Sequence, residues 1–338
     1  MEDLDTTLQK VEEEAQTSLE KGWELTKKAM GAVLEHKKWH YTKAAEAAYN
    51  GVLAEVGKAC LGYTLQGTDD GELALHVIGA HINVFDLYRR VGKLDEALEL
   101  GNQTLDQAMQ LEHHTTESLT GQVRQLQLRA GNFLNLVNSA IAYDHIENER
   151  YDQARSAFLD AERVFSEMPM GDVSAKNVIM IGSNKAANWL NLKRLDIIRG
   201  EEREDSVLDR AESYAGIVRR SLELMEKGGT WESGRMSDQD HANWKANVES
   251  SLGDIALYRG QNDEAEKHYR IALEAAPVAE YDTLTACVEL KLALVVDDLG
   301  EARKYMASVD KFLGKDRDFG VYNFMYMPIV EQVRERLE

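Results

Sequence analysis

Polar side chains with amide, carboxylate and cationic groups recur at helical spacing in three parts of the chain. Asparagine both donates and accepts hydrogen bonds, so an asparagine on an open helix face can bind the backbone of an extended peptide. The candidate partner-binding residues are Asn83, Asp86, Arg90, Lys185, Asn188, Asn191, Arg194, Asn247, Ser250 and Asp254. The simpler alternative is that they are ordinary solvated polar residues.

Histidines form a second group that could do chemistry. His36 and His40 are four residues apart, a spacing at which two side chains on one helix face can bind zinc. The signature of a helical zinc peptidase requires a glutamate after the first histidine, and Lys37 stands there instead. We therefore expect no metal site.

An enzyme or ligand-binding protein with a pocket enclosed by long helices is the alternative function. The residues that would line this pocket are His76, His81, Arg89 and Arg90. The chain contains no GxSxG nucleophile motif and no glycine-rich phosphate loop. We therefore expect no catalytic residues and no cofactor, and we favour a protein that is not an enzyme.

The charge and cysteine content exclude further classes. With 39 Lys+Arg and 59 Asp+Glu, the net charge of 39 − 59 = −20 repels phosphate backbones, so nucleic acid is not an expected partner. Cys60 and Cys287 lie far apart, which excludes a disulfide framework and a cysteine-based zinc site. No apolar run is long enough to cross a membrane, and the acidic N-terminus does not resemble a signal peptide. A cytoplasmic protein is the simplest expectation.

The elements that must position these side chains are helices. Apolar residues recur every three or four positions along nearly the whole chain, period-two alternation is almost absent, and there are only 3 prolines in 338 residues. The fold class is therefore predicted to be all-α. Breaks rich in Gly, Asp, Ser and Thr separate the periodic stretches, and several of them offer a residue that could cap the next helix.

An internal repeat organises these helices. A tetrapeptide made of a bulky residue, two mostly polar residues and alanine occurs six times, and its alanines are 53, 57, 57, 54 and 37 residues apart. The alanines are Ala44, Ala97, Ala154, Ala211, Ala265 and Ala302. Each tetrapeptide is expected to open a new helix just after a break, with the bulky residue filling the turn and alanine lying where two helices cross most closely.

Stacking such hairpins covers the apolar face that each one leaves open, so we expect a right-handed superhelical α-solenoid of about six antiparallel hairpins with long helices. Residues 1–338 would form this single solenoid. Its hairpins would span 4–63, 71–111, 117–166, 174–227, 239–276 and 281–313, followed by a capping helix at 320–337.

Residues 246–279 resemble a tetratricopeptide repeat (TPR) along its full 34-residue length. Leu252-Gly253 matches the Leu-Gly pair of the first TPR helix, and Gly260 matches the turn glycine. The second TPR helix is matched by Ala265, Tyr269, Ala272 and Pro277. Residues 78–111 resemble the pattern through Tyr88, Gly92 and Ala97, but carry Phe85 where a small residue is expected. Intervals longer than 34 residues imply helices two or three turns longer than in a standard TPR.

Long-helix TPR-like arrays commonly act as protein or peptide receptors, so the resemblance implies a non-catalytic scaffold or adaptor that holds a partner segment in its concave groove. Because the protein is acidic, a basic or amphipathic segment would be attracted fastest. The first helix, at 4–35, and the aromatic and methionine-rich 322–330 stretch could also form homo-oligomer contacts. Trp231, in the break at 228–239, is either a lid over the groove or a buried residue that covers a helix end.

Overall fold

The computed structural model describes most of the chain after residue 74. The described residues are 75, 78–79, 81–82, 85–86, 88–89, 92–112, 117–166, 174–201, 206–227, 237–279, 282–314, 319 and 323–338. Ten helices and no strands occur among them, which confirms the all-α fold class. Ala44, His36, His40, His76 and Trp231 lie outside the described residues.

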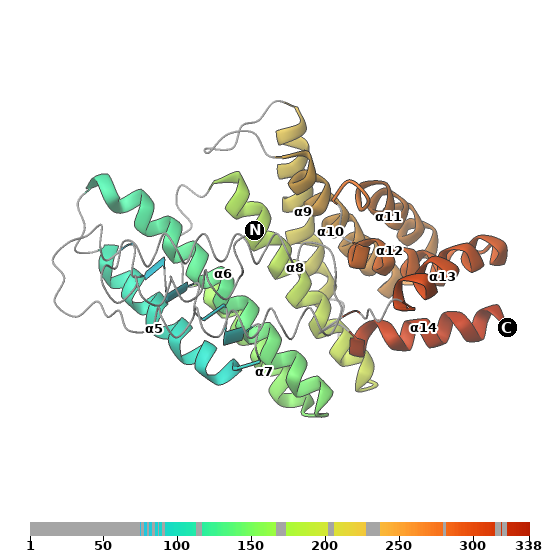
Figure 1. Ribbon diagram of the computed structural model, residues 1–338, viewed down its shortest axis with the longest axis horizontal. Helices are drawn as coiled ribbons and strands as arrows, with labels where there is room; N and C mark the ends of the chain where they lie inside the picture. The colour runs from blue at the N-terminus through green and yellow to red at the C-terminus, as the bar shows by residue number, and fades with distance from the viewer. Residues whose placement is uncertain are drawn as a thin grey trace, which may run out of the picture. The chain divides into compact units, whose positions relative to one another are not determined.

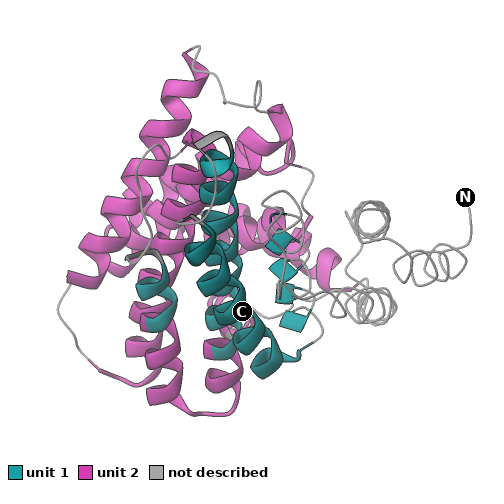
Figure 2. Ribbon diagram, turned by 90° about the vertical axis from the view of Figure 1, so that its left-hand side faces the viewer, with its two compact units in different colours: residues 1–141, 160–169 teal, residues 142–159, 170–338 magenta. Residues whose placement is uncertain are grey.

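The chain divides into two compact units. Unit 1 comprises Met1–Ile141 and Asp160–Pro169, and unit 2 comprises Ala142–Leu159 and Met170–Glu338 (Figure 2). The boundary passes through the two helices α6 (Glu117–Glu147) and α7 (Tyr151–Ser166), so each contributes to both units.

Unit 1 is built around an apolar cluster between α5 (Leu94–Glu112), the first part of α6 and the helical residues that precede α5. Phe85 packs edge-on against Phe133, with ring centroids 6.5 Å apart. The buried members of this cluster are Ile78, Ile82, Phe85, Ala97, Ala108, Ala130 and Val137. Gln127 of α6 donates a hydrogen bond of 3.1 Å to the Ala108 carbonyl of α5, which fixes the two helices side by side.

Besides the parts of α6 and α7 around their connecting turn, the described residues of unit 2 form three helical hairpins and a final helix. The hairpins are α8 (Ala175–Ile198) with α9 (Ser206–Glu226), α10 (Asp238–Tyr258) with α11 (Asn262–Ala275), and α12 (Asp282–Val295) with α13 (Leu299–Leu313). The last helix, α14 (Asn323–Leu337), packs on α12 and α13. Figure 1 shows these helices from yellow-green to red. The inner helices α8, α10 and α12 contact one another in succession, so the hairpins are stacked.

The helix lengths follow the spacing of the repeated alanines. Helices α6, α8, α9 and α10 have 31, 24, 21 and 21 residues, which explains the long intervals before Ala265. Helices α11, α12 and α13 have only 14, 14 and 15 residues, in agreement with the short last interval of 37. The predicted lengthening is therefore confirmed for the middle of the chain.

Four hairpin turns share one hydrogen-bond pattern. In the turn after α10, the Gln261 amide donates to the Ala256 carbonyl at 2.9 Å and the Gly260 amide donates to Leu257, while Gly260 has a φ of 74°. This is the Schellman motif, which satisfies the last helical carbonyls and requires a left-handed residue. Gly92, Glu149 and Gly200 occupy the same place in the other three turns, and Glu149 adopts a φ of 56° without being glycine.

Five of the six repeated alanines lie among the described residues. Ala97, Ala154, Ala211, Ala265 and Ala302 are all fully buried, and each lies in the first two turns of an outer helix. The expectation that a bulky first residue fills the turn is wrong at Leu299, which is 41% exposed. There the Asp298 side chain caps α13 by accepting from the Gly300 and Glu301 amides, so the turn needs no apolar plug.

Candidate functional site

The inner helices of unit 2 carry polar side chains on faces that are buried. On α10, the polar positions 243, 247, 250 and 254 are four, three and four residues apart, so they share one face. On α8, asparagines at 177, 184, 188 and 191 share a face in the same way. Both stripes run toward the C-terminal ends of their helices, where one ionic cluster joins them.

Asp254 of α10 is the centre of this ionic cluster. Its Oδ2 accepts from the Arg194 Nη2 of α8 at 2.6 Å and from the Lys291 Nζ of α12 at 2.9 Å. Its Oδ1 accepts from the Tyr269 hydroxyl of α11 at 2.8 Å. Asp254 is only 4% exposed, and one carboxylate therefore connects all three hairpins.

Lys291 comes from an otherwise apolar stretch of α12 and is 5% exposed. Its Nζ also donates to the Ser250 hydroxyl at 2.8 Å. The rings of Tyr269 and Tyr326 each lie with their centroids 5.7 Å from this ammonium, a distance at which the negative face of an aromatic ring attracts a cation. The two rings thus help to hold a charge that burial alone would disfavour.

Arg194 links the two polar stripes. Its Nη1 donates to the Asn191 Oδ1 at 2.6 Å, its Nη2 binds Asp254, and its Nε donates to the Tyr258 hydroxyl at 3.1 Å. Asn191 in turn donates to the Tyr143 hydroxyl of α6 at 2.8 Å. With 14% of its side chain exposed, Arg194 is more accessible than either Asp254 or Lys291.

The electrostatics of the cluster fix its protonation states. Burial alone would raise the pKa of Asp254, but the charges of Lys291 and Arg194 and the hydrogen bonds that it accepts hold that pKa below its usual range. Burial alone would lower the pKa of Arg194, whereas Tyr258 and Asp254 raise it above its usual value. Burial and the neighbouring Asp254 raise the pKa of Tyr269, so its hydroxyl remains a donor.

This arrangement can fix helix spacing but does not resemble a catalytic site. The cations Arg194 and Lys291 share the carboxylate of Asp254, and the hydrogen bonds of the cluster restrain all three side chains. Removing one partner of a buried ion pair typically costs about 3–5 kcal/mol because the remaining charge stays buried. The cluster therefore makes the relative position of α8, α10 and α12 sensitive to single substitutions.

Sequence reasoning placed four of the cluster's residues among the candidates: Asn191, Arg194, Ser250 and Asp254. The structure brings these four together, although as an internal network and not as a row along an open groove. Asn188 is also buried on α8. We call the sides of α8 and α10 that carry these five side chains the inner face.

The other candidates lie elsewhere. Lys185 extends to α9, where its Nζ lies 4.8 Å from the Tyr214 ring centroid and 3.3 Å from the Tyr214 hydroxyl. Asn247 is half-buried on α10 and bonds to Asn243 one turn earlier.

In unit 1, Asp86 is buried and accepts from Arg89 at 2.7 Å. His81, from the proposed enclosed pocket, is also buried. Asn83 and Arg90 lie outside the described residues, as does His76, so the proposed pocket is only partly described.

Lys291 and the tyrosines were not selected from the sequence. A signal for Lys291 was present, because it is the single charged residue within the apolar run 290–296. A lysine in such a run needs a buried partner. Tyr258, Tyr269 and Tyr326 carried no comparable signal, since each comes from a different helix and their meeting depends on the tertiary fold.

Searches of the described residues for other kinds of site gave two findings. No group of three or more His, Cys, Asp or Glu side chains among them could hold a metal ion. None of the helices in the described part of the chain combines the length and apolar character that a membrane crossing requires.

Comparisons with known proteins gave structural matches alone. No protein-family model and no curated protein matches the chain. The solved structures similar to it include BtubC (BKLC) from P. vanneervenii, at 16% identity and a TM-score of 0.42, which covers 86% of this chain and 91% of that one. The apo form of RapI matches at 12% identity and a TM-score of 0.41 over 97% of this chain and 71% of that one. Nro1, described as a hypoxic regulator of sterol synthesis and a nuclear import adaptor, matches at 11% identity and a TM-score of 0.38. That match covers 98% of this chain and 99% of Nro1.

Proposed function

We propose that the protein is a non-catalytic scaffold that binds a segment of another protein along the inner helices of unit 2. The observation that carries this proposal is the convergence of two amide-bearing stripes, on the contacting helices α8 and α10, at the rigid Arg194–Asp254 pair. An extended segment lying along these stripes would meet their half-buried members, Asn184, Asn243 and Asn247, whose side chains can pair with both its amide and its carbonyl groups.

Asn247 is the best placed side chain to bind such a segment. It is half-buried, and its amide bonds to the Asn243 carbonyl at 2.8 Å and to the Asn243 Oδ1 at 3.1 Å. These bonds stay within one helix turn, so Asn247 can exchange them for a partner's backbone without breaking a contact between helices. Ser250 and Asp254, farther along the same face, are committed to the ionic cluster and provide the rigid end of the surface.

The charge of the chain favours a basic or amphipathic partner segment. A net charge of −20 attracts a cationic segment over a distance of about a Debye length and increases its rate of association. The amide stripes themselves carry no charge. We therefore expect the acidic surface to attract the partner segment at long range, and the asparagines to bind it by hydrogen bonds at short range.

Selection from a random-peptide phage library on the immobilised full chain tests the proposal. Selected peptides should bind Asn247→Ala about three- to tenfold more weakly than the wild type, the effect of one net hydrogen bond. Asn262→Ala is the matched control, because Asn262 is an exposed asparagine at the start of the outer helix α11. Failure to enrich any peptide, or equal losses in both variants, would contradict the proposal.

A further inference from the structure

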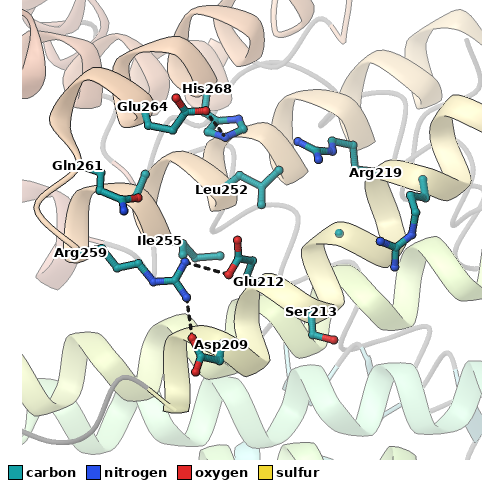
Figure 3. A pocket seen from close by; sticks show the side chains of 13 residues that line it. Asp209, Glu212, Ser213, Arg219, Leu252, Ile255, Arg259, Gln261, Glu264 and His268 are labelled. Carbon is teal, nitrogen blue, oxygen red and sulfur yellow. Dashed lines mark hydrogen bonds and ion pairs between the residues drawn. The ribbon is translucent and has the colours of Figure 1, made fainter.

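A groove with a cavity volume of about 580 Å³ lies between α9, the end of α10 and the beginning of α11 (Figure 3). We call it the lateral groove. It differs from the inner face because its lining includes an outer helix and none of the cluster residues. Its charged lining residues include Asp209, Glu212, Arg219, Arg220, Arg259 and Glu264.

The carboxylates of the lateral groove are already paired. Arg259 donates from Nη1 to Glu212 at 2.8 Å and from Nη2 to Asp209 at 2.7 Å, and Figure 3 shows it between these two acids. Glu264 accepts from the Lys267 Nζ at 2.8 Å. Each carboxylate at this end of the groove therefore has a cationic partner, but Asp209 and Glu212 share the single charge of Arg259.

The histidine of the lateral groove, His268, also has partners within the protein. The Nδ1 of His268 lies 2.6 Å from an oxygen of the buried Glu249, and its Nε2 lies 3.7 Å from Glu264. His268 therefore helps to hold α11 against α10. The charge that the groove can offer to a ligand must come from its other end.

Two arginines of α9 supply that charge. Within the described ranges, the one ion pair of Arg219 is a long contact of 3.8 Å with Glu223 on its own helix. Arg220 is exposed, and no carboxylate in the described part of the chain lies within ion-pair distance of it. Gly216 leaves room beside them, since a Cβ there would contact only the Arg220 Nη1, at 3.8 Å.

We propose that the lateral groove binds a short acidic segment of a partner protein. The arginines can bind its carboxylates through paired N–H donors, which makes these contacts directional. Leu252 and Ile255 line the groove but are only 8% and 2% exposed, so the apolar contact available beside the arginines is Leu224, which is 67% exposed and lies one turn beyond Arg220. The segment should therefore combine acidic residues with at least one apolar residue.

Charge also separates an acidic protein segment from nucleic acid. A nucleic acid carries its phosphates in a continuous row, which the rest of this acidic chain would repel. A few carboxylates can instead reach Arg219 and Arg220 while the remainder of the partner stays away from the acidic surface. The groove is thus a second binding surface, independent of the asparagine stripes of the inner face.

Fluorescence anisotropy with the full chain and a fluorescein-labelled peptide that carries two glutamates and one leucine, the Glu-Glu-Leu peptide, tests this proposal. Arg220→Glu should weaken binding at least about tenfold, because it removes a charge-assisted contact and adds repulsion. Arg163→Glu is the matched control: it makes the same change of charge at an arginine of α7 that is 68% exposed and lies outside the groove. That control should change affinity by less than about twofold, because Arg163 is not among the residues that line the groove.

Three results would overturn the proposal: no saturable binding of the Glu-Glu-Leu peptide to the wild type, equal losses in Arg220→Glu and Arg163→Glu, or tighter Arg220-dependent binding of oligouridylate than of the Glu-Glu-Leu peptide. Thermal melts of both variants should match the wild type, because both arginines are exposed. Peptides selected on the inner face should bind Arg220→Glu normally, so failure of the inner-face proposal and failure of this one are distinguishable.

Discussion

Replacing Gly253 with alanine should destabilise the protein even though alanine is the better helix former. Gly253 lies in the middle of α10, directly under the ring of Tyr269. A Cβ at this position would lie 2.3 and 2.5 Å from two ring carbons of Tyr269 and 3.0 Å from a third. Ordinary carbon contacts are about 3.5–4 Å, so the ring or the helix must move by about 1 Å.

The size of the effect follows from three contributions. Overpacking a core costs about 1–3 kcal/mol. Movement of the ring would also break the 2.8 Å hydrogen bond from Tyr269 to the ionised Asp254, worth about 1.5–3 kcal/mol. The higher helix propensity of alanine offsets about 1 kcal/mol of this destabilisation. The expected net loss in the free energy of unfolding is about 2–5 kcal/mol.

Urea denaturation followed by circular dichroism measures this loss as a lower midpoint. Gly216→Ala is the matched control, since Gly216 lies inside α9 and a Cβ there would make only an ordinary contact, 3.8 Å from the Arg220 Nη1. This substitution should stabilise the protein by up to about 1 kcal/mol. In a Tyr269→Leu background the cost of Gly253→Ala should largely disappear, because the two sites are in contact. If Gly253→Ala is as stable as the wild type, or if its cost persists without the Tyr269 ring, the packing argument is refuted.

Three further substitutions test other parts of the fold. Asp254→Ala should cost about 3–5 kcal/mol by leaving Arg194 without its carboxylate, measured by urea denaturation. The pKa of Asp254 is lower in the folded state, so the ionised carboxylate stabilises the fold fully above its unfolded pKa of about 3.9. This stabilisation is lost as the pH falls through the folded-state pKa. Urea midpoints measured at a series of acid pH values should show the loss in the wild type and not in Asp254→Asn. Ala265→Leu should cost about 1–3 kcal/mol by overpacking where α10 and α11 cross, and an unchanged melting temperature would contradict the role given to the repeated alanine. Glu149→Gly should raise stability by up to about 1 kcal/mol by relieving a left-handed backbone, and a lower melting temperature would show that the Glu149 side chain matters more than its φ.

The sequence predicted local features better than tertiary ones. Hydrophobic periodicity and the repeated tetrapeptide predicted an all-helical fold and the start of each described outer helix, because both depend on residues close together in the chain. The turn glycines Gly92 and Gly260 were recognised by their place in a repeat pattern. Glu149 was not, since nothing in its residue type indicates a left-handed conformation.

The candidate site shows the limit of spacing arguments. Helical periodicity correctly places Ser250 and Asp254 on one face of α10, but it does not tell what lies opposite that face. The opposing group is Lys291, supplied by the next hairpin, and its presence converts an expected solvent-facing stripe into an internal ion cluster. Which charges meet across hairpins depends on how the helices stack, and the sequence pattern of one helix does not contain that information.

The shared carboxylate also bears on how this chain can vary in length. Repeat arrays commonly gain or lose whole units, because each unit meets its neighbours through similar surfaces. Here, deleting α10 and α11 would leave the guanidinium of Arg194 and the ammonium of Lys291 without their counter-ion, Asp254. Duplicating α10 and α11 would separate Arg194 from Lys291, so that one carboxylate could no longer bind both. The middle hairpin is therefore not interchangeable with the others, and changes in repeat number should be tolerated only outside the stretch from α8 to α12.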